Sequence, residues 1–174
     1  ADADRRKKMF LDTMREHGQD VDSKLLYEGD FNSQSGSDAV AYWFDKLGLS
    51  PRAIVVSNDN MAFGVLSALQ ERKLSVPYTV AVTGFDDVES AAMTLPPLTT
   101  VSQPIYQEAK RALGMLVKAI RGETIPFETL EPAVQVLRQS CGCLSQNVNS
   151  FTESLFGASD SIERDIFKLV GMDR

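Results

Sequence analysis

The chain has 174 residues, of which 43% are hydrophobic, and a formal net charge of −6. This length and composition predict one domain with a buried core, or part of a larger one. The acidic net charge and the shortness of the basic clusters argue against binding of a DNA duplex by this chain itself. The lack of a bilayer-length apolar stretch or a signal peptide predicts a cytoplasmic protein with no membrane partner.

Helical and strand patterns alternate from the start of the chain. Apolar spacing predicts helices over residues 5–17, 36–47 and 60–72. One face of the first predicted helix carries Met9, Phe10 and Met14. The predicted stripe of the second carries Val40, Trp43, Phe44 and Leu47. Because Trp43 and Phe44 fit that stripe, a core position is the better interpretation for both than a sugar-stacking role.

Two short apolar runs, at residues 53–57 and 79–83, predict strands between these helices. Strands that are apolar throughout and alternate with helices indicate a parallel sheet covered on its faces. Both runs end in small polar and acidic residues. The predicted fold class is therefore α/β, a doubly wound parallel sheet, with a pocket for a small ligand where the strands end.

The pattern continues after the Pro96-Pro97 pair. A strand is predicted over residues 98–102, a long helix over 104–121 and a half-exposed strand over 133–137. The residues expected to face inward from the long helix are Ala109, Ala112, Leu113, Leu116 and Ile120.

Residues 144–174 form a separate segment with a weak heptad signal. Val148, Leu155, Ile162 and Leu169 are seven residues apart. Two interpretations remain open, a coiled-coil segment and an amphipathic helix that folds back on the domain. The predicted division is thus residues 1–143 as a globular portion and 144–174 as a C-terminal amphipathic helix or linker.

The sequence lacks the common catalytic and nucleotide-binding motifs, including GxGxxG, the P-loop, GxSxG and HExxH. Its one histidine, His17, is expected to interact with the end of its helix. Cys141 and Cys143 are too few for a structural zinc site and are expected to be free thiols. These observations predict a binding module without enzyme activity, cofactor or metal.

Four motifs in a fixed order resemble the effector-binding core of the lactose/galactose-repressor family. They are Asn58-Asp59-Asn60-Met61-Ala62, Val80-Ala81-Val82-Thr83-Gly84-Phe85-Asp86-Asp87, Pro96-Pro97-Leu98-Thr99-Thr100-Val101-Ser102-Gln103-Pro104 and Leu137-Arg138-Gln139-Ser140-Cys141-Gly142. The resemblance covers residues 5 to 142 and implies a type I periplasmic-binding-protein-like fold.

That fold has two α/β lobes with an effector in the cleft between them, and this chain resembles only the second lobe. The resemblance implies a homodimer, and DNA contact only through a helix-turn-helix that this chain does not contain. A central strand expected before residue 5 is also missing, which would leave a sheet edge exposed. We therefore expect the chain to be a fragment, or to be completed by another copy.

The resemblance assigns effector contacts to Arg6, Asn58 and Asp86. An arginine fork and a carboxylate together can hold hydroxyls or the edge of a planar ring. Each residue also has a structural alternative: a solvated helix charge for Arg6, a helix cap for Asn58 and a turn for Asp86. Of Asn58 and Asp59, one is expected to cap the helix and the other to point at the cleft.

The predicted function is that of a sensor domain for a small-molecule effector such as a sugar or a nucleobase. Ligand-dependent lobe closure would carry the signal, either in a transcriptional regulator or in a larger signalling protein. The alternatives are a solute-binding protein of a transport system and an oligomerisation module without a ligand.

Overall fold

The computed structural model describes residues 2–143. Its longer helices are α1 (Asp2–Glu16), α2 (Ser33–Ala41), α3 (Asp59–Glu71) and α4 (Ile105–Ile120). Short 3-10 or π segments are η1 (Ser23–Leu25), η2 (Tyr42–Lys46) and η3 (Glu89–Ala92). The strands are β1 (Ala53–Val55), β2 (Ala81–Thr83), β3 (Thr100–Ser102) and β4 (Val134–Val136). The predicted tail segment, 144–174, lies outside the described residues.

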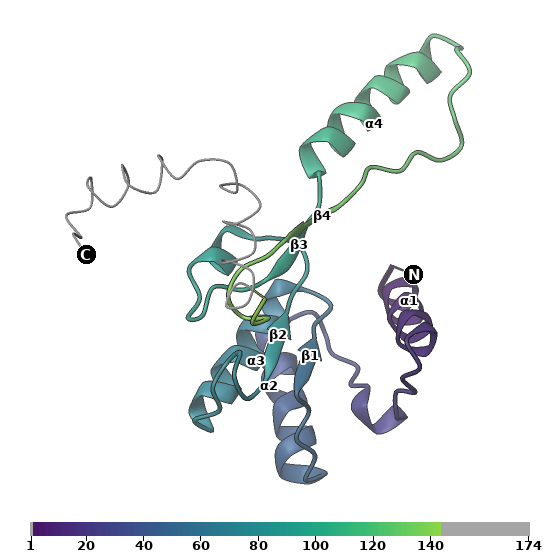
Figure 1. The fold of residues 1–174 in the computed structure, drawn as a ribbon. Helices are drawn as coiled ribbons and strands as arrows, with labels where there is room; N and C mark the ends of the chain where they lie inside the picture. Colours follow the sequence, from purple (N-terminus) through teal and green to yellow (C-terminus); the bar gives the residue numbers. More distant parts are fainter. Residues whose placement is uncertain (1, 144–174) are drawn as a thin grey trace, which may run out of the picture.

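The strands line up in chain order. β1 and β2 are parallel, and a parallel bridge between Thr83 and Thr99 continues the pairing toward β3. The last strand differs from the prediction of a parallel sheet, because β4 runs antiparallel to β3. The parallel strands with their helices confirm the predicted α/β class (Figure 1).

The core lies between the sheet and the pair formed by α2 and α3. Leu69, Val82 and Leu98 are among its fully buried side chains. The two helices approach closely because Gly36 and Gly64 face the neighbouring backbone, where a Cβ would collide with the carbonyl oxygens of Met61 and Ser33, respectively.

Trp43 occupies the core, as predicted, and its indole N–H donates to the Lys24 carbonyl at 3.1 Å. Phe44 is partly buried and packs against the same core cluster. His17 also lies where it was expected, with Nδ1 2.9 Å from the Thr13 carbonyl oxygen at the end of α1.

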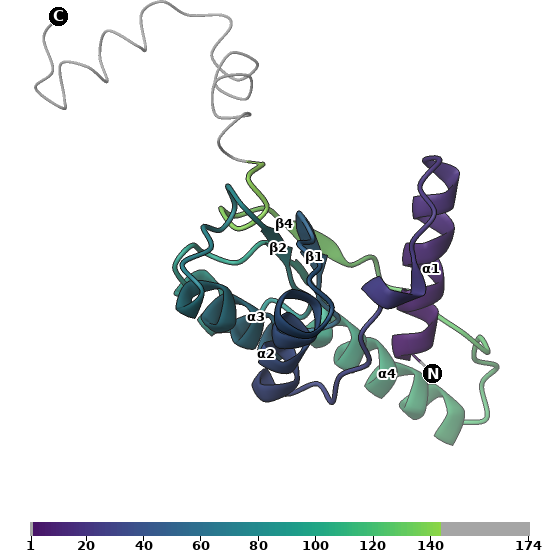
Figure 2. The ribbon, with the colours of Figure 1, turned by 90° about the horizontal axis from the view of Figure 1, so that it is seen from below.

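The prediction for α4 is wrong in one respect. The helix forms over the expected residues, but within the described chain none of its residues is buried. Leu116 is 56% exposed and Ile120 is 77% exposed. The physical reason is visible in Figures 1 and 2, where α4 projects away from the layer formed by α2 and α3.

Two further apolar surfaces are uncovered at the N-terminal side. Met9 of α1 is 64% exposed, and Val55 of β1 is 63% exposed. A half-covered parallel strand is unusual, since both faces of such sheets are normally packed.

No helix in the described part of the chain has the length and apolarity needed to cross a membrane.

Candidate functional site

Asn58 follows β1 and caps α3. Its Oδ1 accepts the Met61 backbone N–H at 2.9 Å, and its Nδ2 donates to the Phe31 carbonyl at 3.0 Å. The side chain is buried. Both polar atoms are therefore occupied within the protein, and the capping alternative describes this residue. Asn58 helps to fix the position of the loop at Phe31.

Asp59 does not point at a cleft, which corrects the expectation for the residue beside the cap. It is fully buried and accepts hydrogen bonds from the Thr100 hydroxyl at 2.6 Å and the Val88 N–H at 3.0 Å. Its backbone N–H donates to the Phe85 carbonyl at 2.8 Å. Asp59 thus connects the ends of β1, β2 and β3, because a buried carboxylate needs several donors.

Gly84 makes room for this connection. A Cβ at Gly84 would collide with Oδ1 of Asp59 and press on Leu98. The glycine in the Gly84-Phe85-Asp86 motif therefore allows the backbone of β2 to approach the buried carboxylate.

Asp86 stands in a strained turn at the end of β2. Its φ is +114° and that of Asp87 is +56°, values that residues other than glycine seldom adopt. Gln103 Nε2 donates to Asp86 Oδ1 at 2.7 Å, and the Asp86 N–H donates to the Val101 carbonyl. The turn is thus held from the β3 side in a conformation that presents a carboxylate.

The surroundings of Asp86 shift the pKa of its carboxyl group upward. Partial burial raises the pKa of the Asp86 carboxyl above its ordinary value, and the charge of Asp59 adds to this effect. The hydrogen bond from Gln103 and the positive charge of Arg6 oppose it without cancelling it. A perturbed carboxyl of this kind is a frequent property of functional sites.

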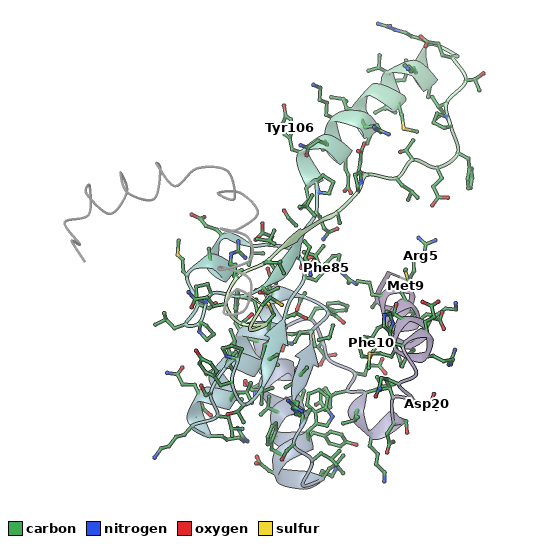
Figure 3. All side chains as sticks on the ribbon, viewed as in Figure 1. Arg5, Met9, Phe10, Asp20, Phe85 and Tyr106 are labelled. Atoms are coloured by element: carbon green, nitrogen blue, oxygen red, sulfur yellow. The ribbon has the colours of Figure 1, made fainter. Side chains whose placement is uncertain are left out.

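Arg6 of α1 reaches the same place. Its guanidinium carbon lies 4.4 Å from the centre of the Phe85 ring, a cation–π contact. Within residues 2–143 its buried Nε has no hydrogen-bond partner. Figure 3 shows Phe85 at the sheet, on the side toward α1 with its labelled Met9 and Phe10.

The structure therefore brings Arg6 and Asp86 together at the carboxyl ends of the strands, with Asn58 anchored one strand away as a cap. Sequence reasoning assigned no role to Phe85 or Gln103. Both lie in motifs that carry the family resemblance, Phe85 directly before Asp86 and Gln103 directly before Pro104. Their positions beside the predicted contacts were the signal that could have identified them.

The segment after β4 contacts the turn at Asp86 and Asp87 through Arg138. Arg138 pairs with Asp87 at 2.7 Å and donates to the Leu98 carbonyl at 2.9 Å. Both partners of this ion pair are mostly buried. The arginine therefore fixes the second residue of the strained turn to the start of the β3 segment.

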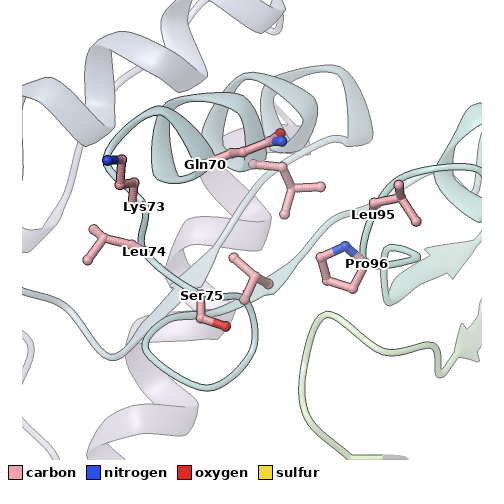
Figure 4. Close-up of a pocket in the computed structure, with 8 residues that line it drawn as sticks. Gln70, Lys73, Leu74, Ser75, Leu95 and Pro96 are labelled. Atoms are coloured by element: carbon pink, nitrogen blue, oxygen red, sulfur yellow. The ribbon is translucent and has the colours of Figure 1, made fainter.

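A separate hollow of about 220 Å³ lies between the end of α3 and the Leu95-Pro96 segment (Figure 4). Its lining includes Gln70, Leu74 and Pro96, and none of the predicted contacts. Within residues 2–143 no three His, Cys, Asp or Glu side chains are placed to hold a metal ion together.

Residues 1–141 match the model of the periplasmic binding protein-like domain. The chain belongs to this family. It is similar to the HTH-type transcriptional regulator AscG of Escherichia coli strain K12, with 34% identity over 113 residues, which are 65% of this chain and 33% of AscG. It thus spans about a third of the length of this curated relative.

Three solved structures of regulators resemble the fold. The E. coli repressor ascG has a TM-score of 0.68 and 31% identity over 75% of this chain and 47% of that chain. The complex of the transcriptional regulator CelR with cellobiose gives 0.70 and 30%, over 75% and 40%. A lac repressor dimer bound to operator gives 0.62 and 31%, over 65% and 39%. The resemblance to the lactose/galactose-repressor family is thereby confirmed.

Proposed function

We propose that this chain is the second-lobe portion of an effector-sensing domain, and that its ligand binds beside Arg6, Phe85 and Asp86. The observation that carries the proposal is the convergence of a cation, an aromatic ring and a carboxylate from α1 and the end of β2. In α/β sheets ligands bind at the carboxyl ends of strands, which is where these side chains lie.

The chemistry of these groups fits a polyhydroxylated ligand. Arg6 offers N–H donors, including an Nε that has no partner within residues 2–143, and Asp86 offers an acceptor that Gln103 holds in place. Sugar hydroxyls both donate and accept, so they satisfy the two groups at once. The cellobiose complex of the related CelR supports a sugar as the effector class.

The site needs a second wall, and we propose that another lobe supplies it. The exposed apolar residues of α4 and β1 are surfaces that a soluble protein normally covers. More than half of each of the three solved structures named above lies outside the region that this chain matches. Ligand bound between two lobes would favour the closed arrangement by its difference in affinity for the two states.

For the whole protein we propose a role in signalling and no catalysis by this domain. It would act in the cytoplasm as a homodimer, with DNA contacted through a separate helix-turn-helix if the output is transcriptional. The lac repressor dimer on its operator supports this form of output. A fused output module would use the same lobe closure.

A thermal-shift screen of the full-length protein tests the proposal. The panel contains monosaccharides, disaccharides and purines, and the variants are Arg6→Leu, Asp86→Asn and the exposed control Arg15→Leu. We expect at least one sugar to raise the unfolding temperature of the wild type and of Arg15→Leu, but not of Arg6→Leu or Asp86→Asn. A shift of equal size in all four proteins, or no shift with any compound, would overturn the proposed site.

A further inference from the structure

The chain contains two cysteines, and both lie in one turn at the end of the described residues. Gly142 between them has a φ of +77°, a conformation that side-chain-bearing residues rarely adopt. Its N–H donates to the Gln139 carbonyl at 3.0 Å. The tight turn brings the Cys143 backbone N–H to 3.2 Å from the Cys141 sulfur, so the two cysteines face a common space.

This turn is fixed to the sheet by a fully buried neighbour, Ser140. The Ser140 hydroxyl donates to the Val82 carbonyl at 2.6 Å and accepts the Thr99 N–H at 2.8 Å. The Val82 N–H in turn donates to the Ser140 carbonyl at 2.9 Å. The Ser140 N–H also donates to the Pro97 carbonyl at 3.0 Å. Four hydrogen bonds therefore hold the residue before Cys141 in place, while Cys141 is half-buried and Cys143 is exposed.

The contacts distinguish the two thiols. Partial burial raises the pKa of Cys141, but hydrogen bonds from the Cys143 side chain, the Thr99 hydroxyl and the Cys143 N–H together outweigh burial and lower that pKa below its ordinary value. The hydrogen bond to Cys141, followed by partial burial, raises the pKa of Cys143. The guanidinium of the nearby Arg138 donates to Asp87 and to the Leu98 carbonyl rather than to a cysteine sulfur.

We infer that Cys141 and Cys143 form a dithiol site that undergoes exchange with small-molecule disulfides. In the first step the Cys141 thiolate attacks one sulfur of the disulfide, the S–S bond breaks, and one thiolate leaves. In the second step the Cys143 thiolate, after loss of its proton to water, attacks the Cys141 sulfur of the mixed disulfide and releases the second thiolate. The two cysteines are oxidised to one disulfide and the small molecule is reduced to two thiols.

A disulfide across a single residue is strained, so it is more easily reduced than a relaxed one. The site would therefore respond reversibly to the thiol–disulfide balance around it. Because the pair directly precedes residue 144, its oxidation would close the turn from which the rest of the chain continues. This inference is independent of the proposed effector site.

Mass spectrometry of the 174-residue chain treated with glutathione disulfide tests the inference, and no other cysteine in the chain confuses the result. Under denaturing conditions the wild type should have the mass of a single chain, not linked to a second one by a disulfide, less the mass of two hydrogen atoms. The matched variants Cys141→Ser and Cys143→Ser should each gain one glutathione. Stable glutathione adducts on the wild type, disulfide-linked dimers, or no reaction would overturn it.

Alkylation by iodoacetamide as a function of pH tests whether the fold builds the site. In Cys143→Ser the serine hydroxyl and backbone N–H still face Cys141, so Cys141 should react with a lower pH midpoint in the folded chain than in concentrated urea. Cys143 in Cys141→Ser should show no such lowering. Equal midpoints for Cys141 in the folded and unfolded chain would contradict the inference.

Discussion

Asn58 and Asp59 are adjacent polar residues with different surroundings. Asn58 begins a helix, whereas Asp59 is enclosed by donors from β3 and the turn after β2. Their sequence pattern indicated a cap and a strand end correctly. It did not reveal which residue was buried, because that depends on Thr100, some forty positions later in the chain.

We predict that Asn58→Ala lowers the free energy of unfolding by about 1–2 kcal/mol, since it removes a helix cap and leaves the Phe31 carbonyl without its donor. Urea unfolding measures the loss. Asn58→Ser keeps an uncharged acceptor for the Met61 N–H and should lose less. A loss for Asn58→Ser equal to that for Asn58→Ala would show that the cap contributes nothing.

Asp86→Asn should change how stability depends on pH. Burial raises the folded-state pKa of Asp86 above the ordinary 3.8, so the folded state binds more protons than the unfolded chain just above that value. The contribution of Asp86 to stability therefore falls as pH rises through this window. Asp86→Asn removes this fall, and asparagine tolerates the positive φ better.

Urea unfolding of both proteins from acidic to neutral pH checks this prediction. The stability of Asp86→Asn relative to the wild type should increase as the pH rises, and then level off. A relative stability that is constant with pH, or that falls, would be inconsistent with a raised pKa at Asp86.

At the scale of elements, the hydrophobic periodicity predicted the positions of helices and strands well. It predicted less well which other elements pack against them. The apolar spacing of α4 placed the helix correctly, but its apolar side chains are exposed. The spacing records which face is apolar and contains no information on the partner of that face. The antiparallel direction of β4 was missed for a similar reason, because pairing direction is set by the path of the connecting segment.

The exposure of α4 leads to a mutational prediction. In the 174-residue chain, Leu116→Gln should change the free energy of unfolding by no more than about 0.5 kcal/mol. The control Leu69→Ala, in the core, should cost about 2–5 kcal/mol. In the full-length protein Leu116→Gln should become clearly destabilising. A large loss already in the 174-residue chain would mean that another part of the chain or a second copy covers α4.

At the scale of the molecule, the sequence predicted the family and fold class from ordered motifs at strand ends, and the comparisons confirm both. The candidate site was predicted less completely. Asp86 was identified from its motif, but Phe85 and Gln103 became evident only when α1 and β3 were placed beside that turn. Both residues lie in the motifs that predicted the site, but the contacts that give them a role join distant segments, and those contacts have no local signature in one sequence.

The most direct test of the proposed effector site is calorimetric titration of the full-length protein with the sugar that gives the largest thermal shift. We predict that Arg6→Leu weakens binding about 10- to 100-fold, the loss expected for a charged hydrogen-bond donor. Arg15→Leu, whose ion pair with Asp12 is exposed on the same helix, should bind as the wild type does. Unchanged affinity in Arg6→Leu would contradict an effector site beside Arg6, Phe85 and Asp86.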